Sequence, residues 1–312
     1  MCCLFGFIDY GRNFTSRQKS VITQALAIAA EARGTDATGI AYNTGGKMTI
    51  YKKPVAAHLL RLHIPDDAVT VLGHTRLTTQ GDGRKNRNNH PFLGHAGKLP
   101  FAFAHNGVLS NDVMLRKSLK LPKTRIATDS YIGVQLIEQK RTLDFASLAY
   151  MAEQVEGVFT FTALDGKDNL YFVKGENPMC IYHFPQSGVY IYASTEEILL
   201  TALDALGIAH SLAEKIPLVC GDILCINRNG SRSESRFDDS HLWERWFLKQ
   251  PYSFGDYLGY EQYSLCEDEA WDDLKSVACC CGYSPDDIDD LRAEGFSYDE
   301  LEEYICCGCG EA

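Results

Sequence analysis

The chain opens with Met1-Cys2-Cys3-Leu4-Phe5-Gly6-Phe7-Ile8, a short apolar run that has no basic region before it and is ended by Asp9. This pattern is not typical of a secretory signal. Cysteine is small enough for the initiator methionine to be removed, which would leave a thiol and a free α-amino group on Cys2. The amine, with a reference pKa of about 7.7–8.0, can accept the proton of a thiol whose reference pKa is about 8.5. Cys2 is therefore a candidate nucleophile that carries its own base.

Downstream of Cys2, polar residues gather in short segments that are rich in glycine, histidine and asparagine. Each segment is too short to identify a site by itself, but the set, in its order behind a penultimate cysteine, is a much stronger signal. The segments are RGTDATG (33–39), GHTRLTTQG (73–81), NNHPF (88–92), HNGVLSN (105–111) and TDS (128–130).

Three of these segments contain groups that suit the hydrolysis of an amide in an amino acid. Asn106-Gly107 offers a side-chain amide beside a backbone N–H, which could stabilise an oxyanion; the alternative for this dipeptide is a hairpin turn. Arg76 could hold a carboxylate in a bidentate fork, and Asp129 could pair with an ammonium group. Their alternatives are a surface ion pair for the arginine and a helix N-cap for the aspartate.

With Cys2, the ordered segments resemble the class II glutamine amidotransferases, whose glutaminase domains occur in glucosamine-6-phosphate synthase and glutamine phosphoribosylpyrophosphate amidotransferase. The resemblance extends through Glu156-Gly157, Asn177-Pro178 and 193–196 to about Gly230, so it covers nearly the whole body of the chain. It implies an N-terminal-nucleophile (Ntn) hydrolase fold, an α+β sandwich with four layers in the order αββα.

The resemblance also implies a role for each matched residue. Cys2 would be the nucleophile, Asn106 and Gly107 the oxyanion hole, and Arg33 and His90 supporting residues. The glutamine-binding residues would be Arg76, Thr79 and Asp129.

The chain departs from the family's pattern at four positions. Cys3 stands where glycine is common, Leu77 where a large aromatic residue is common, and Gln80 where the sugar-phosphate enzyme has histidine. Tyr131 replaces an acid that often follows the Thr-Asp pair. These changes leave the nucleophile and both ends of the amino-acid clamp in place, but they bear on how tightly glutamine is held.

The body also reads as mixed α and β from local patterns. Ser16 is expected to cap a helix that runs to Arg33, and 45–47 reads as a hairpin turn. Strands cluster between groups of helices, which favours an α+β layered architecture over a doubly wound parallel sheet. The expected strands are 48–52, 69–73, 101–105, 158–164, 170–173, 189–193 and 222–226, and the expected later helices are 129–139, 144–155 and 196–206.

Charge and cysteine content divide the chain sharply. The 312 residues carry a net charge of −11, of which residues 264–312 contribute −13 and residues 1–263 contribute +2. Seven of the 12 cysteines lie in that last stretch. We therefore expect a domain at 1–240 (the body), a linker at 241–263, and an acidic, cysteine-rich tail at 264–312.

The tail repeats a capped-helix pattern, in which Ser284-Pro285 and Ser297 each precede acidic helical residues. Two such helices would form a hairpin. The hairpin would bring together cysteines that could bind a structural zinc ion, with free thiols as the alternative; the acidic faces are solvated surface or a docking site for a basic partner. The candidate ligands are Cys279, Cys281, Cys306 and Cys309.

Composition excludes several classes of function. No apolar run approaches 18 residues, so a membrane span is not expected, and no basic stripe suggests nucleic acid. We expect a cytoplasmic location, where cysteines are seldom paired as disulfides.

The expected function is that of a stand-alone glutaminase, with L-glutamine as substrate and no cofactor for the hydrolysis. No segment suits a synthase domain, so an ammonia acceptor would be a subunit on another polypeptide, or absent. The alternatives are an Ntn hydrolase that acts on another amide, and a catalytically idle scaffold that works through its acidic tail.

Overall fold

The computed structural model describes residues 2–240, 242, 275, 284–293 and 301. The chain divides into two units, Met1–Lys249 and Gln250–Ala312. In the second unit the described residues include the helix α8 (Pro285–Ala293), which begins at the proline expected to start the first tail helix. The rest of the expected hairpin, most of the 241–263 linker and the four candidate zinc ligands lie outside the described residues.

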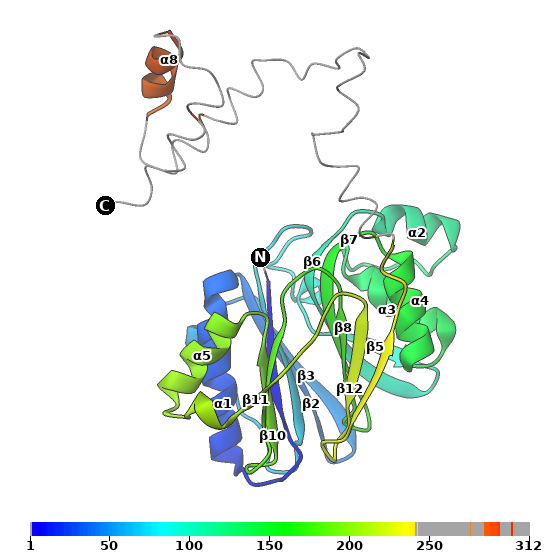
Figure 1. Ribbon diagram of the computed structural model, residues 1–312. Coiled ribbons are helices and arrows are strands. Elements are labelled where there is room, and N and C mark those ends of the chain that lie inside the picture. Colours follow the sequence, from blue (N-terminus) through cyan, green and yellow to red (C-terminus); the bar gives the residue numbers. More distant parts are fainter. Residues whose placement is uncertain (1, 241, 243–274, 276–283, 294–300, 302–312) are drawn as a thin grey trace. The chain divides into compact units, whose positions relative to one another are not determined.

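The body is built on two sheets in which every paired strand is antiparallel to its neighbour (Figure 1). Within residues 2–240, the first sheet has seven strands and the second has six. In spatial order the first contains β11 (Glu214–Ile216), β9 (Cys180–Phe184), β10 (Val189–Ala193), β1 (Cys3–Asp9), β4 (Thr70–Arg76), β2 (Ala37–Thr44) and β3 (Lys47–Lys53). The second contains β13 (Arg232–Arg236), β12 (Asp222–Ile226), β8 (Leu170–Lys174), β7 (Gly157–Asp165), β6 (Leu99–Leu109) and β5 (Phe92–Ala96).

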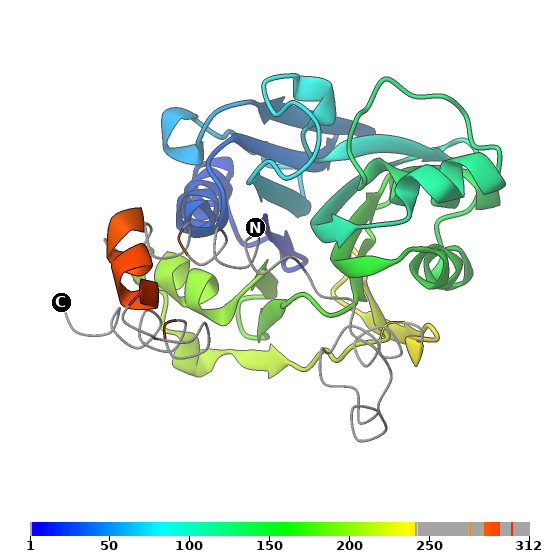
Figure 2. The same ribbon diagram turned by 90° about the horizontal axis from the view of Figure 1, so that it is seen from above.

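Helices cover the outer faces of both sheets. Viewed from above, α1 (Ser16–Ala29) and α5 (Glu196–Ala205) lie on one side of β1, and α3 (Tyr131–Lys140) and α4 (Phe145–Gln154) lie on the other side (Figure 2). The short helix α2 (Asp112–Ser118) follows β6. The 3-10 turns are η1 (Ala30–Arg33), η2 (Ala57–Leu59), η3 (Asn86–Asn88) and η4 (His210–Leu212).

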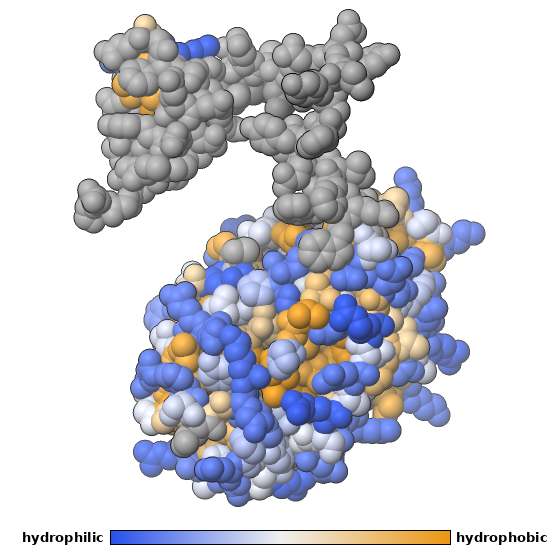
Figure 3. Space-filling model, in the orientation of Figure 1, coloured by the Kyte–Doolittle hydropathy of each residue, from blue (hydrophilic) through white to orange (hydrophobic). Residues whose placement is uncertain are grey.

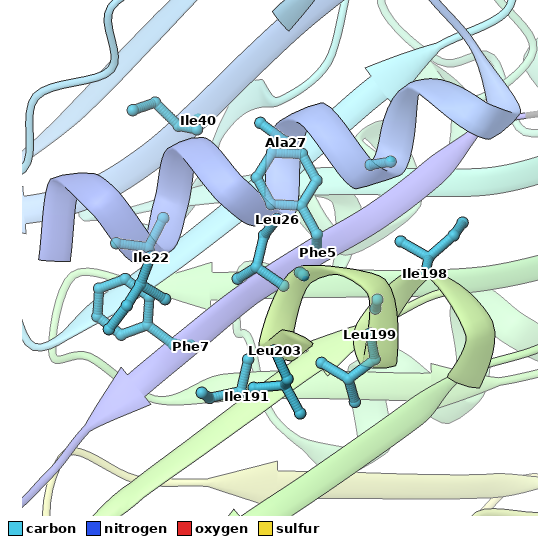
Figure 4. Close-up of a cluster of buried hydrophobic side chains, with 14 of the residues drawn as sticks. Phe5, Phe7, Ile22, Leu26, Ala27, Ile40, Ile191, Ile198, Leu199 and Leu203 are labelled. Atoms are coloured by element: carbon cyan, nitrogen blue, oxygen red, sulfur yellow. The ribbon is translucent and has the colours of Figure 1, made fainter. Parts of the chain in front are cut away.

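The buried side chains of β1 show how the layers form, because successive residues of a strand point to opposite faces. Phe5 and Phe7 pack under α1 and α5 (Figure 4), whereas Leu4 and Ile8 pack between the two sheets. A third apolar cluster fills the space between the second sheet and α3 and α4. The body therefore has the four layers of the expected αββα sandwich.

One face of the body carries an apolar area. The face in Figure 3 is mostly hydrophilic, but apolar side chains gather near its centre, between β11 and β12 in the orientation of Figure 1. Both strands contribute to the apolar cluster between the sheets, through Ile216 and Leu224. Ile216 and Leu224 are themselves buried, at 6% and 1% exposed.

Two local expectations were wrong and one was confirmed. The first helix is capped by Thr15 rather than Ser16, because Thr15 and Gln18 form a reciprocal capping box, and the α-helix ends at Ala29 before a 3-10 turn. The β2–β3 hairpin turns at Gly45 and Gly46, which have φ of 55° and 73°, a region that glycine enters without strain.

A buried ion pair fastens α1 to the strand that begins at Cys3. Lys19 Nζ lies 3.3 Å from Asp9 Oδ2 and donates to the carbonyl oxygens of Asp66 at 2.8 Å and Ala68 at 2.7 Å, and the side chains of the pair are 2% and 0% exposed. Both charges are therefore satisfied away from water.

Replacing Lys19 with methionine leaves the Asp9 carboxylate buried without a cation. We expect the free energy of unfolding to fall by about 3–5 kcal/mol, as measured by urea denaturation. Lys117→Met, the same change at an exposed lysine of α2, should alter it by less than about 0.5 kcal/mol. Equal small effects in the two variants would contradict this account.

Candidate active site

Cys2 lies directly before β1, which sits between β10 and β4 in the first sheet. Its Sγ is 3.5 Å from the carbonyl oxygen of Leu77, and its own carbonyl oxygen accepts a 2.9 Å hydrogen bond from Arg33 Nε. Arg33 belongs to the turn after α1, so helix and loop hold the residue from two sides. The expected supporting arginine thus contacts the backbone of the candidate nucleophile.

The environment of the Cys2 thiol does not favour the thiolate by itself. Burial raises the pKa of Cys2, while the contact with Leu77 and the positive charge of Arg76 act in the opposite direction. A thiol with a raised pKa is a weak nucleophile at neutral pH and needs a neighbouring base. The structure is therefore compatible with a base on the same residue, which the α-amino group of a trimmed Cys2 would supply.

Asn106 and Gly107 lie inside strand β6, where they pair with Thr160 and Phe159 of β7. The hairpin-turn alternative for this dipeptide is therefore wrong. A Cβ on Gly107, whose φ is 150°, would come within 1.9 Å of the carbonyl oxygen of Val158, so only glycine fits there.

The Asn106 amide is fully buried and surrounded by polar groups. Its Oδ1 lies 3.5 Å from Arg33 Nη2, and its Nδ2 lies 3.4 Å from Ser194 Oγ. Its carbonyl oxygen accepts a 2.8 Å hydrogen bond from Asn177 Nδ2. The long side-chain contacts leave Nδ2 able to turn its donors to a ligand, while the backbone is held firmly.

Asp129 is 3% exposed and carries no capping role. The N-cap of α3 is Ser130, without a side-chain capping bond, so the N-cap alternative for Asp129 is wrong. Its Oδ2 accepts from Leu109 N at 2.7 Å and its Oδ1 from Ser130 Oγ at 3.2 Å. A carboxylate has about four acceptor positions, so capacity remains for a ligand.

Arg76 is equally buried, at 3% exposed, at the end of β4. Its Nη1 donates to Asn89 Oδ1 at 2.6 Å and its Nη2 to the carbonyl oxygen of Gln80 at 2.5 Å. Among the described residues, neither Arg76 nor Asp129 has an oppositely charged side chain within 4.0 Å. Both are close enough to Cys2 to shift the pKa of its thiol. Burying an unpaired charge is costly, so this pair is prepared for a ligand that carries both signs.

Two of the expected residues stand apart from this constellation. Thr79 is exposed in the loop after β4, and no hydrogen bond between described residues joins it to the others. His90 is buried, and its ring packs at a tilt against those of His74 and Phe92, with centroid distances of 4.2 and 4.4 Å. Neither of its ring nitrogens has a hydrogen-bond partner among the described residues. Packing is therefore the observed role of His90.

Three residues that contact the site were not assigned from sequence. Ser194 and Asn177 hold the two ends of Asn106, and Gln80 bonds to both Arg76 and Asp129. All three stood in segments that the resemblance covers, but their roles depend on contacts between residues far apart in the chain.

The buried histidines near the site predict sensitivity to acid. Burial lowers the pKa of His74 to about 3 and that of His105 to about 4, although the negative charge of Asp129 raises the latter, and burial lowers the pKa of His90 well below its usual range. In an unfolded chain histidine has a pKa of about 6.5. Below that pH the unfolded state binds protons that the folded state does not, so stability falls as pH falls.

Between pH 7 and pH 5, His74 and His105 together should lower the free energy of unfolding by about 3–4 kcal/mol, and His90 should lower it further in the same direction. Urea denaturation at several pH values measures this, and most carboxylates titrate below the window. A flat profile between pH 7 and pH 5 would mean that these imidazoles are hydrated or charged in the folded protein.

No cluster of three or more metal-ligating side chains occurs among the described residues, and no described helix is long and apolar enough to cross a bilayer. The candidate zinc ligands lie outside those residues, so the zinc site stays a prediction.

Comparison with known proteins found no matching family model. In sequence the chain is similar to glutamine–fructose-6-phosphate aminotransferases (isomerizing). It is 26% identical to that of Listeria innocua over 242 residues, covering 75% of this chain and 37% of the relative. It is 30% identical to that of Mycobacterium tuberculosis over 199 residues, covering 58% and 30%. The chain thus spans about a third of the length of these curated relatives.

In structure the chain is similar to glutamine phosphoribosylpyrophosphate amidotransferase of B. subtilis, with a TM-score of 0.61 and 19% identity over 91% of this chain and 59% of that one. A structure described as the allosteric regulatory enzyme of purine biosynthesis gives a TM-score of 0.62 and 18% identity, over 89% and 57%. At such identities the likeness concerns the fold, and it agrees with the two antiparallel sheets of the body. The sequence relatives and the fold both agree with the resemblance of the body to class II glutamine amidotransferase domains.

Proposed function

We propose that this chain hydrolyses the side-chain amide of L-glutamine to glutamate and ammonia through a thioester on Cys2. The observation that carries the proposal is a pair of buried, opposite charges near the thiol, neither of which has an oppositely charged side chain within 4.0 Å among the described residues. Arg76 matches the α-carboxylate of an amino acid, and Asp129 matches its α-ammonium group. An amide without these groups would bring no counter-charge to either side chain.

The proposed reaction begins after removal of Met1. The α-amine of Cys2 takes the thiol proton, and Sγ attacks the amide carbon of glutamine. Asn106 Nδ2 and the backbone N–H of Gly107 stabilise the oxyanion. The protonated amine returns its proton to the leaving nitrogen, the C–N bond breaks and ammonia departs. Water, activated by the same amine, then cleaves the γ-glutamyl thioester and releases glutamate. This sequence of steps takes no cofactor.

The fate of the ammonia forms a further part of the proposal. The curated relatives are named glutamine–fructose-6-phosphate aminotransferases, and this chain matches about a third of their length. We place any acceptor chemistry on a separate synthase polypeptide, with release of free ammonia as the other outcome. In this view the acidic tail is a docking module for a basic partner, and the enzyme works in the cytoplasm.

The test combines activity with labelling. Purified protein with a trimmed N-terminus is assayed for glutamate release, then incubated with 6-diazo-5-oxo-norleucine and examined by intact mass and peptide mapping. We expect one adduct on Cys2, competed by glutamine and absent from a matched protein that keeps Met1. A trimmed protein that neither reacts nor hydrolyses glutamine would overturn the proposal.

A truncated protein tests whether the body hydrolyses glutamine without the tail. If the body alone carries the activity, deletion of residues 264–312 should leave glutamine hydrolysis within about twofold. Loss of activity on deletion would instead favour a role of the tail in the reaction.

A further inference from the structure

Gln80 contacts both charged residues that the proposed function assigns to glutamine. It lies in the loop that follows β4, and its side chain is exposed. Its Oε1 accepts a 2.6 Å hydrogen bond from the backbone N–H of Asp129, and its carbonyl oxygen accepts a 2.5 Å hydrogen bond from Arg76 Nη2. One residue therefore joins two segments that are about 50 residues apart in the chain.

The contact with Arg76 fixes the direction of the guanidinium plane. Of its five N–H donors, one is used by Gln80 and one by Asn89 Oδ1, which leaves three for a ligand. Asn89 is itself tied to the same loop, because its Nδ2 donates to the carbonyl oxygen of Gly83 at 2.8 Å. The loop thus sets which face of Arg76 can receive a carboxylate.

The contact with Asp129 fixes the residue that is proposed to bind the ammonium end of the amino acid. The Gln80 side chain holds the backbone at Asp129, while Leu109 N and Ser130 Oγ hold the carboxylate. The loop also approaches this segment closely, since a Cβ on Gly81 would come within 2.3 Å of the carbonyl oxygen of Ala127. Of the two residues in the hydrogen bond between Gln80 and Asp129, Gln80 is the one whose side chain can be changed without altering the core.

We infer that Gln80 is a positioning residue that sets the distance between Arg76 and Asp129, and thereby selects substrates with an α-carboxylate and an α-ammonium group. This role rests on the proposed function and makes Gln80 a determinant of the substrate specificity of that site. Gln80 touches no reacting atom; it acts through the two residues that bind the ends of the amino acid.

The kinetic signature follows from this role. Arg76 and Asp129 would hold the amino acid equally in the ground state and the transition state, so misplacing them raises KM and leaves kcat unchanged. Gln80→Met keeps the length of the side chain but removes the acceptor. We expect it to raise the KM for glutamine by about 5- to 20-fold with kcat within about twofold, as for loss of one hydrogen bond that orients a charged group.

Two further variants distinguish a positioning role of Gln80 from a non-specific disturbance of the loop. Gln80→Glu restores an acceptor at the same place and should bring KM back to within about threefold of the parent value. Asn86→Ala is the matched control, because Asn86 is exposed in the same loop and its Nδ2 makes one hydrogen bond, to the carbonyl oxygen of Lys52. It should leave both constants unchanged. A lower kcat with unchanged KM in Gln80→Met would overturn the inference.

A binding measurement does not depend on turnover. In a Cys2→Ala background, calorimetry with L-glutamate should show affinity that Gln80→Met weakens by a similar factor. Binding that is equal with and without Gln80→Met would defeat the inference and leave the proposed function standing. A parent protein that binds neither L-glutamate nor L-glutamine would defeat both.

Discussion

Replacement of Cys2 by alanine should lower glutamine hydrolysis by about 10⁴-fold or more, because the variant loses the atom that forms the thioester. Stability should hardly change, since the side chain is half-buried and makes one long contact, at 3.5 Å, with the carbonyl oxygen of Leu77. The variant should still bind glutamine through Arg76 and Asp129. Steady-state glutamate release measures the first effect, and urea denaturation measures the second.

Cys3 supplies the matched control. It is fully buried, on the face of β1 that packs under α1 and α5, and burial raises the pKa of its thiol to about 11. A buried thiol of this kind is inert, so Cys3→Ala should keep kcat within about threefold. If Cys3→Ala abolished hydrolysis while Cys2→Ala did not, the nucleophile would have been wrongly assigned.

Replacement of Asp129 by asparagine should move activity and stability in opposite directions. The change removes a buried charge that has no cation within 4.0 Å among the described residues, while an amide oxygen can still accept from Leu109 N. We therefore expect the protein to unfold at the same or a higher urea concentration. The ammonium group of glutamine would lose its counter-charge, so KM should rise by about 100-fold or more.

Asp112 offers a contrast for this measurement. It is 4% exposed like Asp129, but its carboxylate is paired with Arg116 at 2.8 Å. Asp112→Asn should therefore lower stability and leave the KM for glutamine unchanged. An Asp129→Asn protein that loses stability but keeps its KM would show that Asp129 is structural, and would favour hydrolysis of an amide other than glutamine.

The site could be predicted from sequence where chemistry and spacing restrict the residue type. Arg76 and Asp129 lie close enough to Cys2 to shift the pKa of its thiol, and Asn106 lies near Arg33, which binds the Cys2 carbonyl oxygen. The position of Asn106-Gly107 inside a strand excludes the hairpin turn. His90 and Thr79 could not be placed in this way. Their positions depend on ring packing and on the course of a loop, which leave no periodic trace in the sequence.

The fold was harder to predict at its centre than at its periphery. All residues of β1 are buried, because helices cover one face and a second sheet the other, so the strand lacks the apolar–polar alternation that marks a half-exposed strand. Strand β2 also lacks this alternation, because all of its residues except the last are buried. The exact cap of α1 was missed because Thr15 and Ser16 are both good caps, and only the contact with Gln18 decides between them.

The position of β1 also determines when during synthesis the site can be completed. One neighbour of this strand, β4, emerges within the first 76 residues, but the other, β10, spans Val189–Ala193, and Ser194 bonds to both Leu4 and Asn106. A ribosome must therefore make almost two hundred residues before the first strand has both partners. Cys2 is the earliest part of the proposed site to be made, and the strand that follows it obtains its second partner late. If Met1 is removed as proposed, this order leaves the amino terminus accessible for that removal while the chain is still growing.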